Sequence, residues 1–159
     1  MITVVNFNPR LQNYLSDTHA LLLSGPLVIH DSVRAITLHG SRGLCGHPRP
    51  DSDIDLALII DEKRLNGHVE PESLLREVLE TTLEGWNGRV EVDLAAVYDR
   101  EKCGLKCLTV IEHNFHGCAR TIDCMGVYKI QRGFNGYVDT HELDCRKMQP
   151  SMLIWDNKA

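Results

Sequence analysis

Long apolar runs are missing from this sequence of 159 residues. No stretch approaches the roughly 20 apolar residues that a membrane-spanning helix needs, and the opening MITVVNFNPR lacks the basic start and apolar centre of a signal peptide. We therefore expect a cytoplasmic protein with no membrane partner. Internal repeats, low-complexity tracts and linkers are missing as well, so the length predicts one domain spanning residues 1–159.

Excess positive charge is also missing, because the formal net charge is −5. This balance argues against broad, sequence-independent attraction to nucleic acid, which requires clustered cations. It leaves room for a local basic groove, so nucleic acid stays among the partner classes to be tested. The C-terminal part alternates basic and aromatic residues, which fits a stacking surface for an acceptor or, as we favour, a strand-rich cap with an ordinarily charged face. These residues are Arg120, Lys129, Arg132, Arg146, Lys147, Tyr128, Phe134, Tyr137 and Trp155.

A disulfide framework is not expected, although the chain has six cysteines, because a reducing compartment keeps thiols free. The segment CGLKCLTVIEHNFHGC nevertheless gathers side chains that zinc prefers. Its spacing departs from that of standard zinc sites, so we favour buried free thiols over a zinc-stabilised structural protein. The residues concerned are Cys103, Cys107, His113, His116 and Cys118.

Hydrophobic periodicity predicts the order helix–strand–strand–helix–strand–helix. We expect helices over 9–24, 71–84 and, more weakly, 100–114, and strands over 33–39, 53–60 and 89–98. Glycines after residue 117 divide β-prone pieces into short strands or a hairpin. The order predicts an α/β (α+β) fold, with helices flanking a mixed sheet. We place the core at about 9–115 and a C-terminal extension at about 116–159.

Three aspartates crowd the start of the apolar stretch DSDIDLALII. Residues i and i+2 of a strand share one face, so Asp53 and Asp55 are expected to point together, whereas Asp51 is a turn residue after Pro50. Two adjacent carboxylates repel each other unless a cation lies between them, and Mg²⁺ prefers oxygen ligands. The pair therefore predicts a magnesium site.

A third acid is available from the strand RVEVDLAAVY. If this strand lies beside 53–60, Asp93 completes a three-carboxylate cluster, with Glu91 as the alternative third ligand. Three acids around Mg²⁺ favour chemistry on a polyphosphate, because the metal bridges phosphate oxygens and aligns the attacking and leaving oxygens. The third acid is placed to accept a proton from an attacking hydroxyl.

A glycine-serine pair precedes the aspartates. Gly40 allows the backbone to approach a ligand closely, and a turn that leads from a strand into a helix presents free N–H groups to a phosphate. Ser41 can add a hydrogen bond and Arg42 a positive charge. The segment 43–50 is rich in Gly and Pro and predicts a loop that returns to the aspartate strand.

The combined stretch GSRGLCGHPRPDSDIDLAL, followed by VEVDL, resembles the signature of the nucleotidyltransferase superfamily related to DNA polymerase β. It is most similar to the small members called minimal nucleotidyltransferases. The resemblance covers residues 33–98 and implies transfer of a nucleoside monophosphate from a nucleoside triphosphate, with ATP as the expected donor, to an acceptor hydroxyl with two Mg²⁺ ions. It implies that the three aspartates hold the metals, that Asp93 helps to activate the acceptor, and that Gly40 and Ser41 hold the triphosphate.

The motif does not by itself establish turnover, because a fold can carry several functions. Small members of the superfamily include proteins thought to act as partners of a second protein, as in toxin–antitoxin pairs. The alternative is therefore a non-catalytic or regulatory nucleotide-binding subunit. Because the chain is short, its unknown acceptor must be small, be held by the C-terminal extension, or be presented by a protein partner or a second copy in a homo-oligomer.

Overall fold

The computed structural model describes residues 2–4, 6–44, 46–104, 107–109, 124–138 and 151–157. A six-stranded sheet forms its centre, in the order β7-β6-β5-β4-β3-β8. Its strands are β3 (Val33–His39), β4 (Ile54–Ile60), β5 (Val92–Asp99), β6 (Met125–Lys129), β7 (Gly136–Val138) and β8 (Met152–Asp156). A separate two-stranded sheet contains β1 (Ile2–Val4) and β2 (Leu27–Ile29). The helices are α1 (Pro9–Tyr14), α2 (Ser16–Leu23), α3 (Glu62–Asn66) and α4 (Pro71–Gly85).

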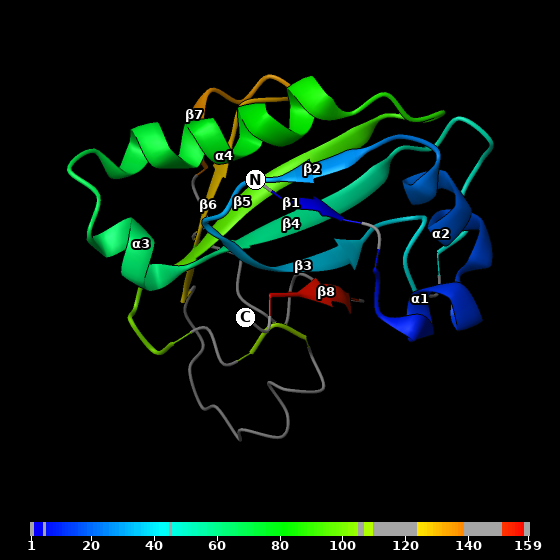
Figure 1. Ribbon diagram of the computed structural model, residues 1–159, viewed down its shortest axis with the longest axis horizontal. Helices are drawn as coiled ribbons and strands as arrows, with labels where there is room; N and C mark the ends of the chain where they lie inside the picture. The colour runs from blue at the N-terminus through cyan, green and yellow to red at the C-terminus, as the bar shows by residue number, and fades with distance from the viewer. Residues whose placement is uncertain are drawn as a thin grey trace.

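The arrangement is the predicted mixed sheet flanked by helices. Figure 1 shows α3 and α4 along one face of the sheet and α1 and α2 at one end of it. In β4, the residues from Leu56 to Ile60 are all buried, because helices and loops cover both faces of a central strand. The apolar end of the aspartate strand is thus explained by its central position.

Strand directions bring three chain segments to one edge of the sheet. β4 and β5 are parallel, with α3 and α4 forming the crossover between them, so both strands begin at the same edge. β3 is antiparallel to β4 and therefore ends where β4 begins. Residues just after β3 and residues at the start of β4 and β5 consequently lie together.

Helix α4 follows the predicted apolar stripe and holds the crossover against the sheet. Leu74, Leu75, Val78 and Leu79 are buried in the main core. The Thr82 hydroxyl on the same helix is fully buried and donates to the carbonyl oxygen of Val28 at 2.7 Å. Because a buried hydroxyl needs such a partner, this bond fixes α4 against β2 as well.

Two elements differ in extent from their prediction. The expected helix over 9–24 is divided at Leu15, whose φ of −137° and ψ of 57° are not helical. The expected strand over 89–98 begins only at Val92. The Trp86 indole N–H donates to the carbonyl oxygen of Val90 at 2.8 Å, so the segment before β5 is held by a side chain instead of by strand pairing.

The expected helix over 100–114 is wrong for its described part. Residues 100–104 and 107–109 form bends and irregular structure. Lys102 and Gly104 have φ values of 56° and 87°, and left-handed residues interrupt a right-handed helix. The rest of this segment lies outside the described residues, as do His113, His116 and Cys118. Cys103 is a free thiol.

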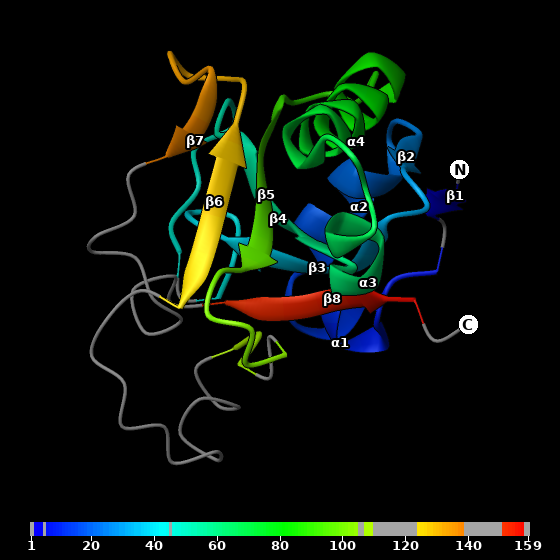
Figure 2. The same cartoon turned by 90° about the vertical axis from the view of Figure 1, so that its left-hand side faces the viewer.

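Segments beyond residue 115 complete both edges of the same sheet. β6 and β7 form the predicted hairpin, and β6 pairs with β5. β8 instead pairs with β3 at the opposite edge. Figure 2 shows β6 and β7 on one side and β8 across the base of the sheet. The C-terminal extension is therefore continuous with the core in its hydrogen bonding.

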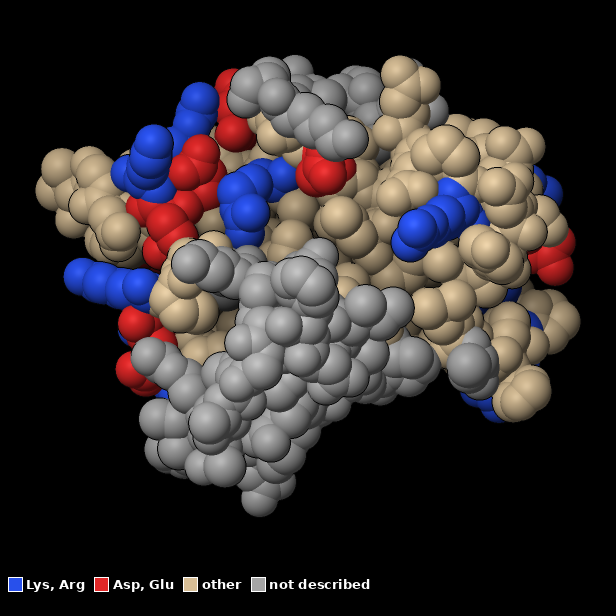
Figure 3. All heavy atoms as spheres, turned by 90° about the horizontal axis from the view of Figure 1, so that it is seen from below, with Lys and Arg blue, Asp and Glu red and all other residues tan. Residues whose placement is uncertain are grey.

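Charges of both signs are interspersed on one face of the molecule (Figure 3). On the face in Figure 3, Lys and Arg lie beside Asp and Glu toward the α3 end, while uncharged residues dominate the described surface toward the other end. No broad basic patch is visible on the described part of that face. None of the helices in the described ranges combines the length and apolarity required to cross a membrane.

Leu79→Ala is expected to lower the free energy of unfolding by about 2–5 kcal/mol, because Leu79 is 0% exposed and its loss leaves a cavity under α4. Leu23→Ala, at a side chain 50% exposed, should change it by less than about 0.5 kcal/mol. Urea unfolding of both variants measures the difference. Equal effects would contradict the packing described for α4.

Candidate functional site

Three aspartates meet at the edge where β4 and β5 begin: Asp55 in β4, Asp93 in β5, and Asp53 just before β4. Asp55 and Asp93 are direct partners in the parallel register, and Asp53 lies two residues before Asp55 on the same face. Each of the three offers a carboxylate oxygen within 4.8 Å of those of the other two. The predicted adjacency of the two strands is confirmed.

The end of β3 completes this edge through Gly40. His39 pairs with Asp55 across the β3–β4 ladder, and Gly40 follows with a φ of 74°. A Cβ at Gly40 would overlap the Asp55 carboxylate. Glycine is therefore required twice here, for its left-handed conformation and for the close approach of the carboxylate to the backbone.

The segment after Gly40 forms successive turns. The Gly43 N–H donates to the Gly40 carbonyl at 3.0 Å, and the Gly46 N–H to the Gly43 carbonyl at 3.4 Å. No helix begins in the described residues between β3 and β4, so the Gly40 turn does not lead into a helix N-terminus, and a loop follows it, as predicted for 43–50. A Cβ at Gly46 would overlap the Ser41 backbone, and the loop therefore packs tightly onto the turn.

A polar cavity of about 390 Å³ opens beside the aspartates. It joins the turn after β3, the loop before β4, the residue preceding β5 and the turn after β6. Its lining residues are Ser41, Arg49, Asp51, Ser52, Asp53, Glu91 and Arg132. Ser41 and Asp53, both predicted site residues, thus face one space.

Arg42 has a structural position inside this loop. Its side chain donates to the carbonyl oxygens of Ser52 at 2.6 Å, Arg49 at 2.9 Å and Pro50 at 3.1 Å. Its own carbonyl accepts from the Thr18 hydroxyl at 2.7 Å. Arg42 is only 6% exposed, so its buried guanidinium holds the loop to the turn. Its backbone carbonyl ties the turn to α2. The structure does not bring the guanidinium to the carboxylate cluster.

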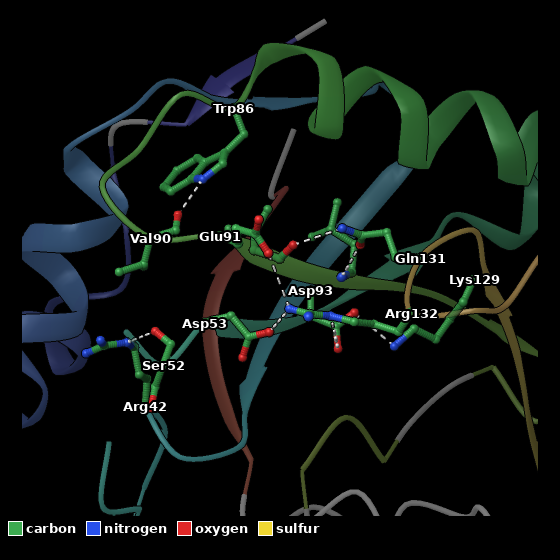
Figure 4. A network of polar contacts seen from close by, with 12 residues as sticks. Arg42, Ser52, Asp53, Trp86, Val90, Glu91, Asp93, Lys129, Gln131 and Arg132 are labelled. Carbon is green, nitrogen blue, oxygen red and sulfur yellow. Dashed lines mark hydrogen bonds and ion pairs between the residues drawn. The ribbon is translucent and has the colours of Figure 1, made fainter. Parts of the chain in front are cut away.

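Two cations from the β6–β7 hairpin contact the aspartates (Figure 4). The Lys129 ammonium donates to Asp93 Oδ1 at 3.0 Å, and both side chains are 17% exposed. The Arg132 guanidinium pairs with Asp53 and lies 4.0 Å from Asp93 Oδ2. Three carboxylates are therefore offset by two cations, which lowers their mutual repulsion.

Gln131 fixes the hairpin turn to the start of β5. Its side-chain oxygen accepts from the Leu94 N–H at 2.9 Å, and its amide donates to the Val92 carbonyl at 3.1 Å. Backbone pairing between β5 and β6 begins only at Ala96. The Gln131 amide thus continues the ladder beyond the last backbone pair and sets the positions of the two cations.

Asp55 is the carboxyl whose protonation the cluster changes most clearly. Burial, with the charges of Asp53 and Asp93 and a hydrogen bond with Asp93, raises the pKa of Asp55 from 3.8 to about 6, against the opposing charge of Lys129. Close carboxylates cannot all ionise easily without a cation. The cluster therefore has the electrostatic character of a cation site.

Glu91, the alternative third ligand, has a different environment from Asp93. Its side chain is 84% exposed and lies 3.7 Å from the Arg132 guanidinium, outside the three-aspartate group. Sequence reasoning missed the roles of Lys129, Gln131 and Arg132. The basic residues of the hairpin, interleaved with aromatic ones, were visible in the sequence, but their proximity to Asp53 and Asp93 depends on long-range pairing.

Gly40→Ala is expected to lower the free energy of unfolding by at least about 2 kcal/mol, because it adds a steric overlap with Asp55 to left-handed strain. Gly133→Ala is the matched control, since Gly133 has a φ of 84° and an added Cβ would have open space. It should cost about 1 kcal/mol from conformation alone. Denaturant unfolding compares them, and equal losses would contradict the close approach at Asp55.

Asp55→Asn is expected to stabilise the metal-free protein at pH 7 by about 1–2 kcal/mol, after allowance for the partial exposure of this side chain. Since the folded state raises the pKa of Asp55 to about 6, the stability contributed by Asp55 falls as the pH rises from about 4 to 6. The Asn variant lacks this decline, so the two proteins should converge below pH 4. Urea unfolding with chelator from pH 3.5 to 8 measures this.

Asp51→Asn is the control for the pH series, because the Asp51 side chain is 83% exposed and outside the cluster. Its stability should follow the wild-type curve throughout. A less stable Asp55→Asn protein at pH 7 would contradict the repulsion within the cluster.

Comparisons with family models, curated proteins and solved structures gave no match to this chain. The resemblance to nucleotidyltransferases therefore rests on the residues from Gly40 to Asp93 and remains a prediction. The geometry of these residues is independent of that resemblance, because it results from the strand register and the Gly40 turn.

Proposed function

We propose that this protein is a Mg²⁺-dependent nucleotidyltransferase that moves a nucleoside monophosphate from a nucleoside triphosphate to an acceptor hydroxyl. The observation that carries the proposal is the approach of Asp53, Asp55 and Asp93 to within 4.8 Å beside the Gly40 turn. A motif spread over more than 50 residues of sequence thereby corresponds to one small region of the molecule.

The donor set fits magnesium. All three side chains supply carboxylate oxygen, which is the ligand type that Mg²⁺ prefers over the nitrogen and sulfur ligands of zinc. Asp53, with a side chain 28% exposed, and Asp93, at 17%, are open enough to exchange a ligand. When bound, Mg²⁺ would neutralise phosphate charge and align the attacking and leaving oxygens.

The chain's own residues would bind and orient the triphosphate. Ser41 lines the cavity beside Asp53, so its hydroxyl can donate to a phosphate oxygen there. Gly40 keeps the backbone close to Asp55. Arg42 acts indirectly, because its bonds to three loop carbonyls maintain the distance between the turn and the start of β4.

The proposed reaction is a displacement at the α-phosphorus. The acceptor oxygen forms a bond to that phosphorus, the bond to the oxygen bridging the α- and β-phosphates breaks, and pyrophosphate leaves with the bonding electrons. The acceptor proton passes to the carboxylate of Asp93, which acts as general base. The Lys129 ammonium, 3.0 Å from Asp93 Oδ1, orients that carboxylate.

The test is Mg²⁺-dependent release of pyrophosphate and transfer of label from α-labelled nucleoside triphosphates, with protein, nucleic-acid and small hydroxyl acceptors supplied separately. Asp93→Ala and Asp53→Ala are expected to lower the transfer rate at least about 100-fold, because each removes a carboxylate that stabilises the reacting groups. Asp31→Asn is the control, because Asp31 is exposed in the turn before β3, at the edge of the sheet opposite the aspartates, and this variant should retain most of the rate.

Absence of transfer with every acceptor class, together with identical behaviour of Asp53→Ala, would overturn the proposal. A second protein that copurifies tightly, without pyrophosphate release, would then favour the non-catalytic regulatory subunit. Transfer that is equal in wild type and in Asp93→Ala would also contradict it, since the proton would have another acceptor.

A further inference from the structure

Arg132 is held against the aspartates by side-chain charge. Its guanidinium pairs with Asp53, lies 3.7 Å from Glu91 Oε2 and has its Nε 4.0 Å from Asp93 Oδ2. Figure 4 shows it extending from the hairpin turn to a position between Asp53 and Asp93. A guanidinium therefore lies among carboxylates that the proposed function requires for a divalent cation.

The backbone at this position is unusual for an arginine. Arg132 has a φ of 58° and is followed by Gly133 with a φ of 84°. A left-handed residue other than glycine is strained, and such strain concentrates at functional positions. Since Gln131 fixes the adjacent residue to β5 through two hydrogen bonds, the turn directs the Arg132 side chain to the cluster.

Lys129 and Arg132 differ in how easily their side chains can move away from the aspartates. Lys129 lies in strand β6, is 17% exposed and has its ammonium 5.6 Å from the centre of the Phe134 ring. Arg132 lies in a turn and is 44% exposed. Because an exposed ion pair is worth little and its charged end stays hydrated, Arg132 is the cation that can move at low cost.

The space that would receive the displaced side chain adjoins the cluster. Arg132 lines the same 390 Å³ cavity as Ser41 and Arg49. A guanidinium binds phosphate oxygens in a bidentate manner. A phosphate bound in this cavity would therefore offer the Arg132 guanidinium a second anionic partner beside Asp53, with no change required in the fold.

We infer that Arg132 is an internal counter-cation, which a divalent metal displaces from Asp53 and which then binds the triphosphate in the adjoining cavity. This inference rests on the proposed function. It makes Arg132 a triphosphate-binding residue with two successive partners. Metal and triphosphate should therefore bind cooperatively, because the metal releases the group that the triphosphate needs.

The first test measures Mn²⁺ binding alone, by calorimetry, to wild type, Arg132→Ala and Arg132→Gly. Both variants are expected to bind Mn²⁺ about five to tenfold more tightly than wild type, because the competing cation is gone. Arg132→Gly suits the left-handed backbone, so a disturbed turn would not explain its result. Arg64→Ala is the charge-matched control, because Arg64 belongs to α3 after the far end of β4, and it should bind Mn²⁺ as wild type does.

The second test measures binding of the preformed magnesium complex of inorganic tripolyphosphate to the same proteins. Arg132→Ala and Arg132→Gly are expected to bind it about tenfold more weakly than wild type, and Arg132→Lys should recover part of the loss. The side-chain Nε–Hε NMR signal of Arg132 reports the exchange directly. In a sample without Mn²⁺, this signal should shift when Mg²⁺ is added and shift again when tripolyphosphate is added.

Unchanged or weaker Mn²⁺ binding by both Arg132 variants would overturn the inference, as would tripolyphosphate affinity equal to wild type. Either result could coexist with Asp93-dependent nucleotidyl transfer, which would leave the proposed function standing. If wild type bound no divalent metal at all, the proposed function would fail and this inference with it.

Discussion

The mutual repulsion of three carboxylates is the constraint on which this structure depends. Asp55 and Asp93 are forced together by the parallel register of β4 and β5, and the backbone at Gly40 closes over Asp55 without a side chain. The hairpin beyond β5 then supplies Lys129 and Arg132. The strand register and the Gly40 turn thus bring the carboxylates together, and the hairpin supplies the positive charges that offset their repulsion.

Short-range geometry made part of the site predictable from the sequence. The common face of Asp53 and Asp55 results from the two-residue strand period, and the position of Asp93 results from the helix that joins two parallel strands. Gly40 was expected to let a ligand approach the backbone closely. In the structure the group that approaches this backbone is the Asp55 carboxylate. Local pattern therefore identified Asp53, Asp55 and the turn, whereas the choice of Asp93 over Glu91 came from the resemblance.

Features that depend on distant pairing could not be predicted in the same way. In the sequence, Lys129 and Arg132 look like the basic residues of any charged hairpin. Only the pairing of β6 with β5 brings them to the cluster. Arg42 was expected to add charge at a phosphate, but burial and three carbonyl acceptors make it part of the loop. Helix propensity also could not reveal the left-handed conformation of Lys102, which is incompatible with the expected helix.

The position of β6 and β8 late in the chain has a consequence for biosynthesis. A ribosome releases β3, β4 and β5 well before it releases the hairpin and the final strand, which pair with β5 and β3. Such long-range pairing is slow and occurs after collapse of the earlier segments. In a nascent chain that still lacks β6, the three aspartates have neither Lys129 nor Arg132 beside them, and only ions of the solvent can screen their repulsion.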